Sequence, residues 1–416
     1  MTRFDVGIVG GGIGGAALGQ YLARHGLRVL IAEREAVFRD RVRGEWMAPW
    51  GVAELKRLGL YERFLAAGGH HIRRQVGYDE LLSAAEAEAR EIPVHLLHPD
   101  IPGPLALEHV VMQNEALAAA ADAGVDVRRG VSAKLTGKAG DYGLAISGAE
   151  GGETVACRWV VGADGRSSAI RRALGLPLNE APLDHLIAGL LIDGADGWPE
   201  DQQSIGVFGD MQYLIFPQGN GKVRLYADYT YDGAARFNGE NGAAAMLAAF
   251  DIPALPNSQA IARARPIGPC RSYPSQDAWV DEPVVEGVLL IGDAGGYNDP
   301  ILGQGLSVTL RDARIVGELF VGHDTWCRET FAPYIAERRE RLRRLRAAAA
   351  FVTTLNGRYG TEDKARRERA FASMASSSQP MHPGFAAYVG PEALPAELFE
   401  PEYYEAVFGT RRYFVA

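Results

Sequence analysis

The sequence predicts an α/β protein: a Rossmann-like nucleotide-binding domain that carries an inserted β-sheet domain (an α+β insert) and is followed by C-terminal helices. Three observations support this fold class. A strand, a glycine turn and a helix follow one another between residues 6 and 22. Short strand-like runs separated by turns dominate residues 177–282. A late buried strand at 287–291 then leads into another glycine-rich loop and long helical segments.

The first strand, residues 6–9, ends in the glycine run 10–15, which opens a helix. In this context Gly10 allows a tight turn, Gly12 lets a pyrophosphate approach the backbone, and Gly15 lets the helix pack closely on the strand. The helix N-terminus adds free N–H groups and a partial positive charge. The pattern therefore predicts a phosphate-binding turn rather than a simple packing turn.

The next strand, residues 27–32, ends at Glu33, which lies eighteen residues after Gly15. A carboxylate near this distance is expected to accept a hydrogen bond from a ribose hydroxyl of a bound dinucleotide. Together with the glycine run, Glu33 makes dinucleotide binding the favoured interpretation.

The remaining elements follow from apolar spacing and turn residues. Residues 51–67 have the pattern of an amphipathic helix, residues 113–123 are also helical, and residues 73–104 are irregular. Strands are expected at 125–127, 131–136, 143–147, 154–161, 185–192, 213–216 and 222–229, and the last helices at 303–321 and 325–354.

These elements predict three domain-like parts, because the late strand completes the sheet that the first strand begins. The nucleotide-binding domain is discontinuous, the β-rich insert interrupts it, and a helical extension ends the chain. The boundaries are 1–72, 105–176 and 283–345 for the first part, 73–104 and 177–282 for the insert, and 346–416 for the extension.

With 416 residues, 47% of them hydrophobic and 23% charged, the chain has the composition of a soluble globular protein. Its net charge of −9 argues against a nucleic-acid partner.

No apolar run reaches the ~18 residues of a membrane span, and the N-terminus has no signal-peptide pattern. The three cysteines are widely spaced, so we expect reduced thiols in a cytoplasmic protein, and the scattered histidines predict no metal site. Both a monomer and a homodimer remain open.

Six arginines crowd the helical segment 338–346. We interpret them as a solvated helix face that is partly paired with Glu337 and Glu340. The alternative is a surface for an acidic partner or a membrane.

Two further motifs follow buried strands. Asp164-Gly165 comes at a strand end and opens a helix; taken alone, it is best explained as a turn with a helix cap. The loop Gly292 to Gly305 is polar and glycine-rich and lies between a strand and a long helix. Its backbone N–H groups suit an electron-rich ligand edge, and Asp293 sits where α/β sheets place ligand contacts.

Together the three motifs resemble those of the group A FAD-dependent monooxygenases, the aromatic hydroxylases of the para-hydroxybenzoate hydroxylase type, over roughly the first 350 residues. The resemblance implies an FAD-binding domain of the glutathione-reductase type. The residues that it places at FAD are Gly10, Gly12, Ile13, Gly14, Gly15, Glu33, Arg34, Arg41, Arg43, Gln113, Asp164, Gly292, Asp293, Pro300, Gly303, Gly305 and Leu306.

Two positions depart from the family pattern. Gly296 stands where the family often has histidine, and Ser307 stands where it usually has asparagine. Both lie beside the expected flavin position, so FAD binding is expected to persist while the substrate geometry and the reaction are open.

The resemblance also implies the chemistry. Reduced flavin would pass electrons to O2 and form a C4a-hydroperoxide that hydroxylates or epoxidises an apolar, preferably aromatic small molecule. NAD(P)H would reduce the flavin without a Rossmann unit of its own. Substrate-side candidates are Trp46, Met211, Tyr213, Phe216, Arg224, Tyr226, Tyr297 and Asn298, of which Tyr213, Arg224, Tyr297 and Asn298 are the candidates for catalysis; core packing is the alternative role for most of them.

Rival functions remain open on the sequence. A flavin-dependent halogenase, a two-component monooxygenase supplied with reduced flavin, and a prenyl-reductase-like flavoprotein share this kind of domain. Halogenases of this fold usually carry a Trp-x-Trp-x-Ile-Pro stretch, which the sequence lacks. A flavin-free binding protein of the same fold is the non-enzymatic alternative, and the intact acidic residues Glu33, Asp164 and Asp293 disfavour it.

Overall fold

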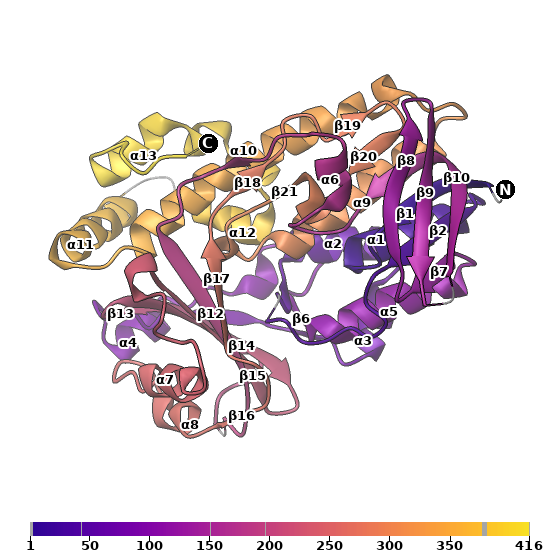
Figure 1. Ribbon diagram of the computed structural model, residues 1–416. Helices are drawn as coiled ribbons and strands as arrows, with labels where there is room; N and C mark the ends of the chain where they lie inside the picture. The colour runs from indigo at the N-terminus through magenta and orange to yellow at the C-terminus, as the bar shows by residue number, and fades with distance from the viewer. Residues whose placement is uncertain (1–2, 43, 150, 196, 377–380, 416) are drawn as a thin grey trace.

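The computed structural model describes residues 3–42, 44–149, 151–195, 197–376 and 381–415. Two large sheets dominate it: one is near the N-terminus in Figure 1, and the other lies below the C-terminal helices. The helices are α1 (Ile13–Arg24), α2 (Pro49–Arg57), α3 (Tyr61–Ala66), α4 (Ala84–Ala89), α5 (His109–Asp122), α6 (Ala169–Ala173), α7 (Gly242–Ala249), α8 (Ser258–Ala262), α9 (Gly305–Val321), α10 (Ala332–Asn356), α11 (Thr361–Ser376), α12 (Ala386–Val389) and α13 (Pro401–Phe408).

The first sheet contains the elements predicted for nucleotide binding. Its strands are β1 (Arg3–Val9), β2 (Val29–Glu33), β7 (Asp126–Arg129), β8 (Ser132–Lys138), β9 (Asp141–Gly148), β10 (Gly151–Gly162), β19 (Val284–Val285) and β20 (Val288–Leu290). The order β20-β10-β1-β2-β7 is parallel throughout, so the carboxyl ends of these five strands meet at one edge.

Both faces of this parallel sheet are covered. Helices α1, α5 and α9 pack on one face, where Ile8, Leu18, Ile31, Leu117 and Leu310 share one buried core. The antiparallel strands β8 and β9 and helix α6 cover the other face. Coverage on both faces explains why these strands are continuous apolar runs in the sequence.

The second sheet comes from the predicted β-rich insert. Its strands are β5 (Arg74–Val76), β12 (His185–Asp193), β13 (Gln202–Phe208), β14 (Met211–Gly219), β15 (Lys222–Thr230), β16 (Arg265–Pro266) and β17 (Arg271–Ser275). Helices α7 and α8 pack on one face. On the other face, Leu214 and Phe216 join a core with Ile301, Leu302 and Leu345. This face therefore meets the late glycine-rich loop and helix α10.

The remaining strands of the described residues form two three-stranded sheets. One contains β3 (Trp46–Met47), β4 (His70–His71) and β6 (Leu105–Ala106). The other contains β11 (Asn179–Glu180), β18 (Ala278–Trp279) and β21 (Gly296–Tyr297). Short 3-10 helices include η3 (Gly292–Gly295) and η4 (Pro300–Leu302) in the late loop.

One predicted helix is divided in the structure. The expected helix 51–67 is two helices, α2 and α3, because the chain turns at Gly59, whose φ is +73°. That left-handed conformation favours glycine and ends a helix.

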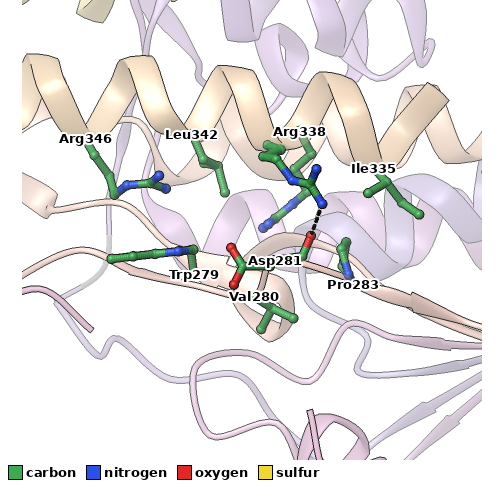
Figure 2. Close-up of a pocket in the computed structure, with 9 residues that line it drawn as sticks. Trp279, Val280, Asp281, Pro283, Ile335, Arg338, Leu342 and Arg346 are labelled. Atoms are coloured by element: carbon green, nitrogen blue, oxygen red, sulfur yellow. Dashed lines mark hydrogen bonds between the residues drawn. The ribbon is translucent and has the colours of Figure 1, made fainter. Parts of the chain in front are cut away.

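The prediction that the arginines of 338–346 form a solvated face is wrong for three of them. Arg338, Arg341 and Arg346 are buried, because α10 packs against α9 and against the segment that follows β17. Figure 2 shows Arg338 and Arg346 pointing from α10 toward Trp279–Pro283, around a cavity of about 20 Å³. The Arg346 guanidinium lies 4.2 Å from the centre of the Trp279 ring.

Candidate active site

Three glycine loops lie side by side at the carboxyl edge of the first sheet. We call residues 10–15 the first loop, residues 163–168 the second loop and residues 292–305 the third loop; they follow β1, β10 and β20. Ala163 N–H donates to Val9 O at 2.8 Å, and Ile291 N–H donates to Gly162 O at 3.0 Å. The sheet topology thus brings together the three motifs that the sequence separates.

The first loop has room for a ligand at one glycine. A Cβ at Gly10 would lie 2.3 Å from Ala163 O, at Gly14 2.3 Å from Thr309 Cγ2, and at Gly15 2.0 Å from Gly10 O. A Cβ at Gly12 would meet nothing within 4 Å. Gly12 is also the N-cap of α1, and no side chain caps the helix there. The loop is therefore a backbone cradle that fits a pyrophosphate.

Glu33 lies beside this cradle at the end of β2. Its Oε2 accepts the Gly11 N–H at 2.6 Å, and its Oε1 accepts the Glu35 N–H at 2.7 Å. These bonds fix the carboxylate while each oxygen retains a further lone pair. The residue is therefore positioned to accept ribose hydroxyls.

In the second loop, Asp164 caps a helix as its simpler interpretation predicted. Its Oδ2 accepts the N–H groups of Ala169 and Ile170 at 2.6 and 3.3 Å. Its Oδ1 is buried and has no hydrogen-bond partner among the residues that the structure describes. An acceptor of this kind fits a bound ligand with a donor. Arg171 ties the second loop to the third, because its Nη1 donates to Ala294 O at 2.9 Å.

The third loop is held from behind by α9 and α10. Asp312 Oδ2 accepts the Gly292 N–H at 2.8 Å and the Arg338 Nε–H at 3.0 Å. Arg338 also donates to the carbonyls of Gly292, Gly295 and Gly296 at 3.0, 2.8 and 3.1 Å. Arg341 pairs with Asp312 Oδ1 at 2.7 Å. We call Asp312, Arg338 and Arg341 the loop clamp. Burial alone would raise the pKa of Asp312, but the two arginines hold it below its usual value.

The front of the third loop carries the predicted ligand groups. Asp293 Oδ2 lies 3.5 Å from Arg166 Nε of the second loop. The Arg166 guanidinium is 4.3 Å from the centre of the Tyr297 ring. Further along, Gly303 has a φ of +68°, and a Cβ at Gly305 would meet nothing within 4 Å. Gly305 starts α9, so a second helix N-terminus opens onto the site.

Packing explains both departures from the family pattern. Gly296 has a φ of +110°, and a Cβ there would lie 2.5 Å from Ala278 O, because Gly296 pairs with Trp279 of β18. At Ser307, helices α2 and α9 come so close that a Cβ on Gly51 would lie 2.2 Å from Ser307 Oγ. A side chain at position 296 therefore has no space, and the close approach of α2 and α9 restricts the size of the side chain at position 307.

The other predicted FAD residues differ in their surroundings. Ile13 and Leu306 are buried at the starts of α1 and α9. Gln113 is half-buried in α5. Arg34 and Arg41 both contact Glu35 beyond the end of β2, the latter at 2.7 Å. Arg43 lies outside the described residues.

Three substrate-side candidates meet near the third loop. The Trp46 ring lies 5.9 Å from the Phe216 ring, which lies 6.1 Å from the Tyr226 ring. A Cβ at Gly303 would lie 3.4 Å from the Trp46 ring. These aromatic side chains therefore connect the second sheet with the third loop.

Met211 and Tyr213 are not brought to this place. They lie on the opposite face of β14, in the core with α7 and α8, where Tyr213 O–H donates to Tyr78 O at 2.7 Å. Burial in this core raises the pKa of Tyr213 well above its ordinary value. Strand alternation separates them from Leu214 and Phe216.

Arg224 is fully buried on the face that Phe216 shares, and two carboxylates hold it. Its Nε donates to Glu45 Oε2 at 2.7 Å, and its Nη2 contacts Glu45 Oε1 and lies 3.0 Å from Asp40 Oδ2. Burial raises the pKa of Glu45 to about 7, against the opposing effect of Arg224. Two acidic groups thus face one guanidinium, and this arrangement does not favour an anionic ligand group.

Tyr297 and Asn298 have different surroundings within the third loop. Tyr297 is half-buried next to Arg166. Asn298 is buried, and its side-chain amide donates to Asp277 Oδ1 at 2.5 Å. Asn298 therefore has a contact that stabilises the loop itself.

Sequence reasoning missed several residues at this site. Gln203 accepts the Trp46 indole N–H at 2.7 Å, and its amide donates to Gln75 at 2.7 Å and to Tyr388 at 3.1 Å. Tyr388 comes from the C-terminal extension and stands 5.9 Å from Trp46, edge to face. No local pattern marks these residues.

Among the described residues, no helix is long and apolar enough to span a bilayer.

Comparisons with known proteins show the family and the fold of this chain. The family described as "FAD binding domain" matches residues 3–347. Squalene monooxygenase SE1 of Panax ginseng is 27% identical over 321 residues, which cover 76% of this chain but only 58% of that protein. Digeranylgeranylglycerophospholipid reductase 2 of Methanothermobacter thermautotrophicus is 25% identical over 330 residues, covering 76% of this chain and 77% of that protein. The crystal structure of p-nitrophenol 4-monooxygenase PnpA from Pseudomonas putida superposes with a TM-score of 0.76 at 20% identity, covering 91% and 95% of the two chains.

Proposed function

Because the chain belongs to the FAD binding domain family, we propose that it is an FAD-dependent monooxygenase that hydroxylates or epoxidises an apolar small molecule. NAD(P)H is the proposed electron donor and O2 the proposed oxidant. The observation that carries the proposal is the convergence of the three glycine loops at one sheet edge, with two helix N-termini that begin at open glycines. The domain boundaries derived from the sequence are part of this proposal.

Each loop has a proposed part in holding FAD. The first loop cradles the pyrophosphate at Gly12, and Glu33 accepts the ribose hydroxyls. Asp293 binds the ribityl chain. The backbone from Pro300 to Leu306 faces the ring, where the N-terminus of α9 favours negative charge. The loop clamp keeps the third loop in this conformation.

Bound FAD supplies the redox chemistry, taking two electrons from a nicotinamide and passing them to O2, so that one oxygen atom enters the substrate and the other leaves as water. The protein's own residues bind, orient and exclude water. Trp46, Phe216 and Tyr226 form the apolar wall that orients the substrate. The pairing of Arg224 with Glu45 and Asp40 favours a substrate that is neutral at this position.

The test of this function begins with the purified protein. Flavin absorbance after reconstitution with FAD, NAD(P)H oxidation stimulated by a neutral aromatic or alkene substrate, and one atom of labelled O2 in the product are the expected results. A protein that ignores added FAD contradicts the proposal. Halide-dependent product points instead to a halogenase.

A reductase that saturates a prenyl double bond is the second candidate. The share of each relative that the match covers favours this candidate: 77% of the Methanothermobacter reductase against 58% of the ginseng monooxygenase. Anaerobic incubation with a reductant separates the two functions. A saturated product without O2 supports the reductase, and a strict need for O2 supports the monooxygenase.

We predict that Phe216→Ala raises KM about tenfold for an apolar substrate, because deleting an apolar contact of this size costs about 1–3 kcal/mol of binding. FAD affinity should change little. Steady-state kinetics and an FAD titration check both statements. Tyr213→Phe is the matched control, because it lies on the other face of the same strand and should leave KM unchanged. Equal effects of the two variants on KM would contradict this placement of the substrate.

A further inference from the structure

A buried charge cluster joins the second sheet to the third loop. His185 of β12 is 4% exposed and lies among three carboxylates. Its Nδ1 is 2.5 Å from Asp184 Oδ1, and its Nε2 is 3.1 Å from Asp299 Oδ2 and 3.7 Å from Asp228 Oδ2. Asp299 belongs to the third loop, whereas Asp228 belongs to β15. His185 is thus a direct contact between the substrate-side sheet and the loop proposed to face FAD.

Asp299 determines the conformation of that loop. Its Oδ1 accepts the Ile301 N–H and the Ser275 hydroxyl, each at 2.9 Å. Its own N–H donates to Asp277 Oδ1 at 2.9 Å. The carboxylate therefore caps η4, the turn that leads directly to Gly303. A change in the orientation of Asp299 would release both hydrogen bonds at once.

The surrounding charges favour the protonated form of His185 and the ionised form of Asp299. Burial alone would lower the pKa of His185, but Asp228 and Asp299 raise it well above its usual value. Burial alone would raise the pKa of Asp299, but His185 holds it below its usual value. Burial also raises the pKa of Asp228 to about 7 and that of Asp277 to about 7.

The other charged and titratable neighbours lie at the edge of the cluster. Arg358 pairs with Asp184 at 2.5 Å, and the Tyr359 hydroxyl donates to Asp228 O at 2.8 Å. Arg346 acts electrostatically on Asp277. His185 is therefore the cation that stands directly between Asp228 and Asp299.

We propose that His185 is a positioning residue that, through the Asp299 carboxylate, holds residues 300–302 in the conformation required to bind FAD. The inference rests on the proposed function, since it concerns the same cofactor. Without the imidazolium, the carboxylates of Asp228 and Asp299 would face each other in a buried place. Such a pair relaxes by moving apart or by taking up a proton, and either change weakens the cap on η4.

The first test measures the Kd for FAD of folded apoprotein by flavin fluorescence, with no turnover required. His185→Gln should raise Kd about tenfold or more. His382→Gln is the control for the substitution itself, because His382 is half-buried, stacks on Phe351 and accepts the Gly384 N–H at 3.2 Å. Its Kd should equal that of the wild type. Wild-type protein that binds no FAD refutes the proposed function, whereas His185→Gln with wild-type Kd refutes only this inference.

A second variant separates charge from packing. Adding Asp228→Asn to His185→Gln removes the opposed carboxylate, so Kd should recover at least threefold relative to His185→Gln alone. A purely structural role for the His185 ring predicts no recovery, and that result overturns the proposal.

The pH dependence is a third test and does not need His185→Gln to fold. A raised pKa means that the imidazolium is fully present at neutral pH and is lost as pH rises through that pKa. Wild-type Kd should rise in alkaline solution, at a pH above the range around 7 in which Asp228 and Asp277 titrate. Asp228→Asn removes one of the carboxylates that raise this pKa, so the rise should move to lower pH. A transition at the same pH in both proteins contradicts the assignment to His185.

Discussion

Replacing Asp312 with alanine is expected to lower the free energy of unfolding by about 3–5 kcal/mol, because the buried Arg338 loses its counter-charge and the buried Arg341 keeps only Glu337 of its two carboxylate partners. Asp312 has no exposed surface, and Arg338 is 1% exposed. The same change removes the acceptor of the Gly292 N–H, so the third loop loses this hydrogen bond to α9. Urea unfolding of the apoprotein measures the stability, and an FAD titration should show weaker binding in whatever fraction folds.

Asp210→Ala is the matched control for this prediction. Asp210 also pairs with an arginine, Arg236, at 2.8 Å, but its side chain is 74% exposed. Exposed pairs of this kind contribute about 0–1 kcal/mol. If Asp312→Ala cost no more than Asp210→Ala, the loop clamp would not stabilise the fold.

Gly12→Ala is expected to raise the Kd for FAD about 100-fold, equivalent to about 2.7 kcal/mol, while leaving the apoprotein as stable as the wild type. The φ of Gly12 is −64°, which alanine adopts without strain, and the added Cβ would meet no protein atom within 4 Å. The methyl group would instead occupy the space assigned to the pyrophosphate. A fluorescence titration and a urea unfolding curve together check the two halves of the prediction.

Gly152→Ala provides the comparison for Gly12→Ala. Gly152 is exposed near the start of β10, at the opposite end of that strand from the second loop. Its substitution should leave the Kd for FAD unchanged. Gly12→Ala protein with wild-type FAD affinity would place the pyrophosphate elsewhere and would remove the main support for the first loop as its cradle.

The sequence was sufficient to predict the parallel strands of the first sheet and the three motifs, since each prediction rests on a local pattern. The glycine run, Glu33, Asp164 and Gly292-Asp293 each follow an apolar strand, and parallel strands end at a common edge. The helix break at Gly59 was missed because the apolar spacing continues through it. Arg338 and Arg341 of α10 were misjudged because their partner, Asp312, lies on another helix.

The sequence by itself therefore determined the parallel sheet and the three glycine loops, because strand, turn and helix propensities act over a few neighbouring residues. Only the tertiary structure decided which face of β14 meets the third loop, and so separated Phe216 from Tyr213. Alternation along a strand specifies two faces but not which one packs against a given partner. The tertiary structure also placed His185 against Asp299, which is 114 residues further along the chain. Buried charges are stabilised by whichever residues the fold brings within a few ångströms, and no short-range pattern encodes that contact.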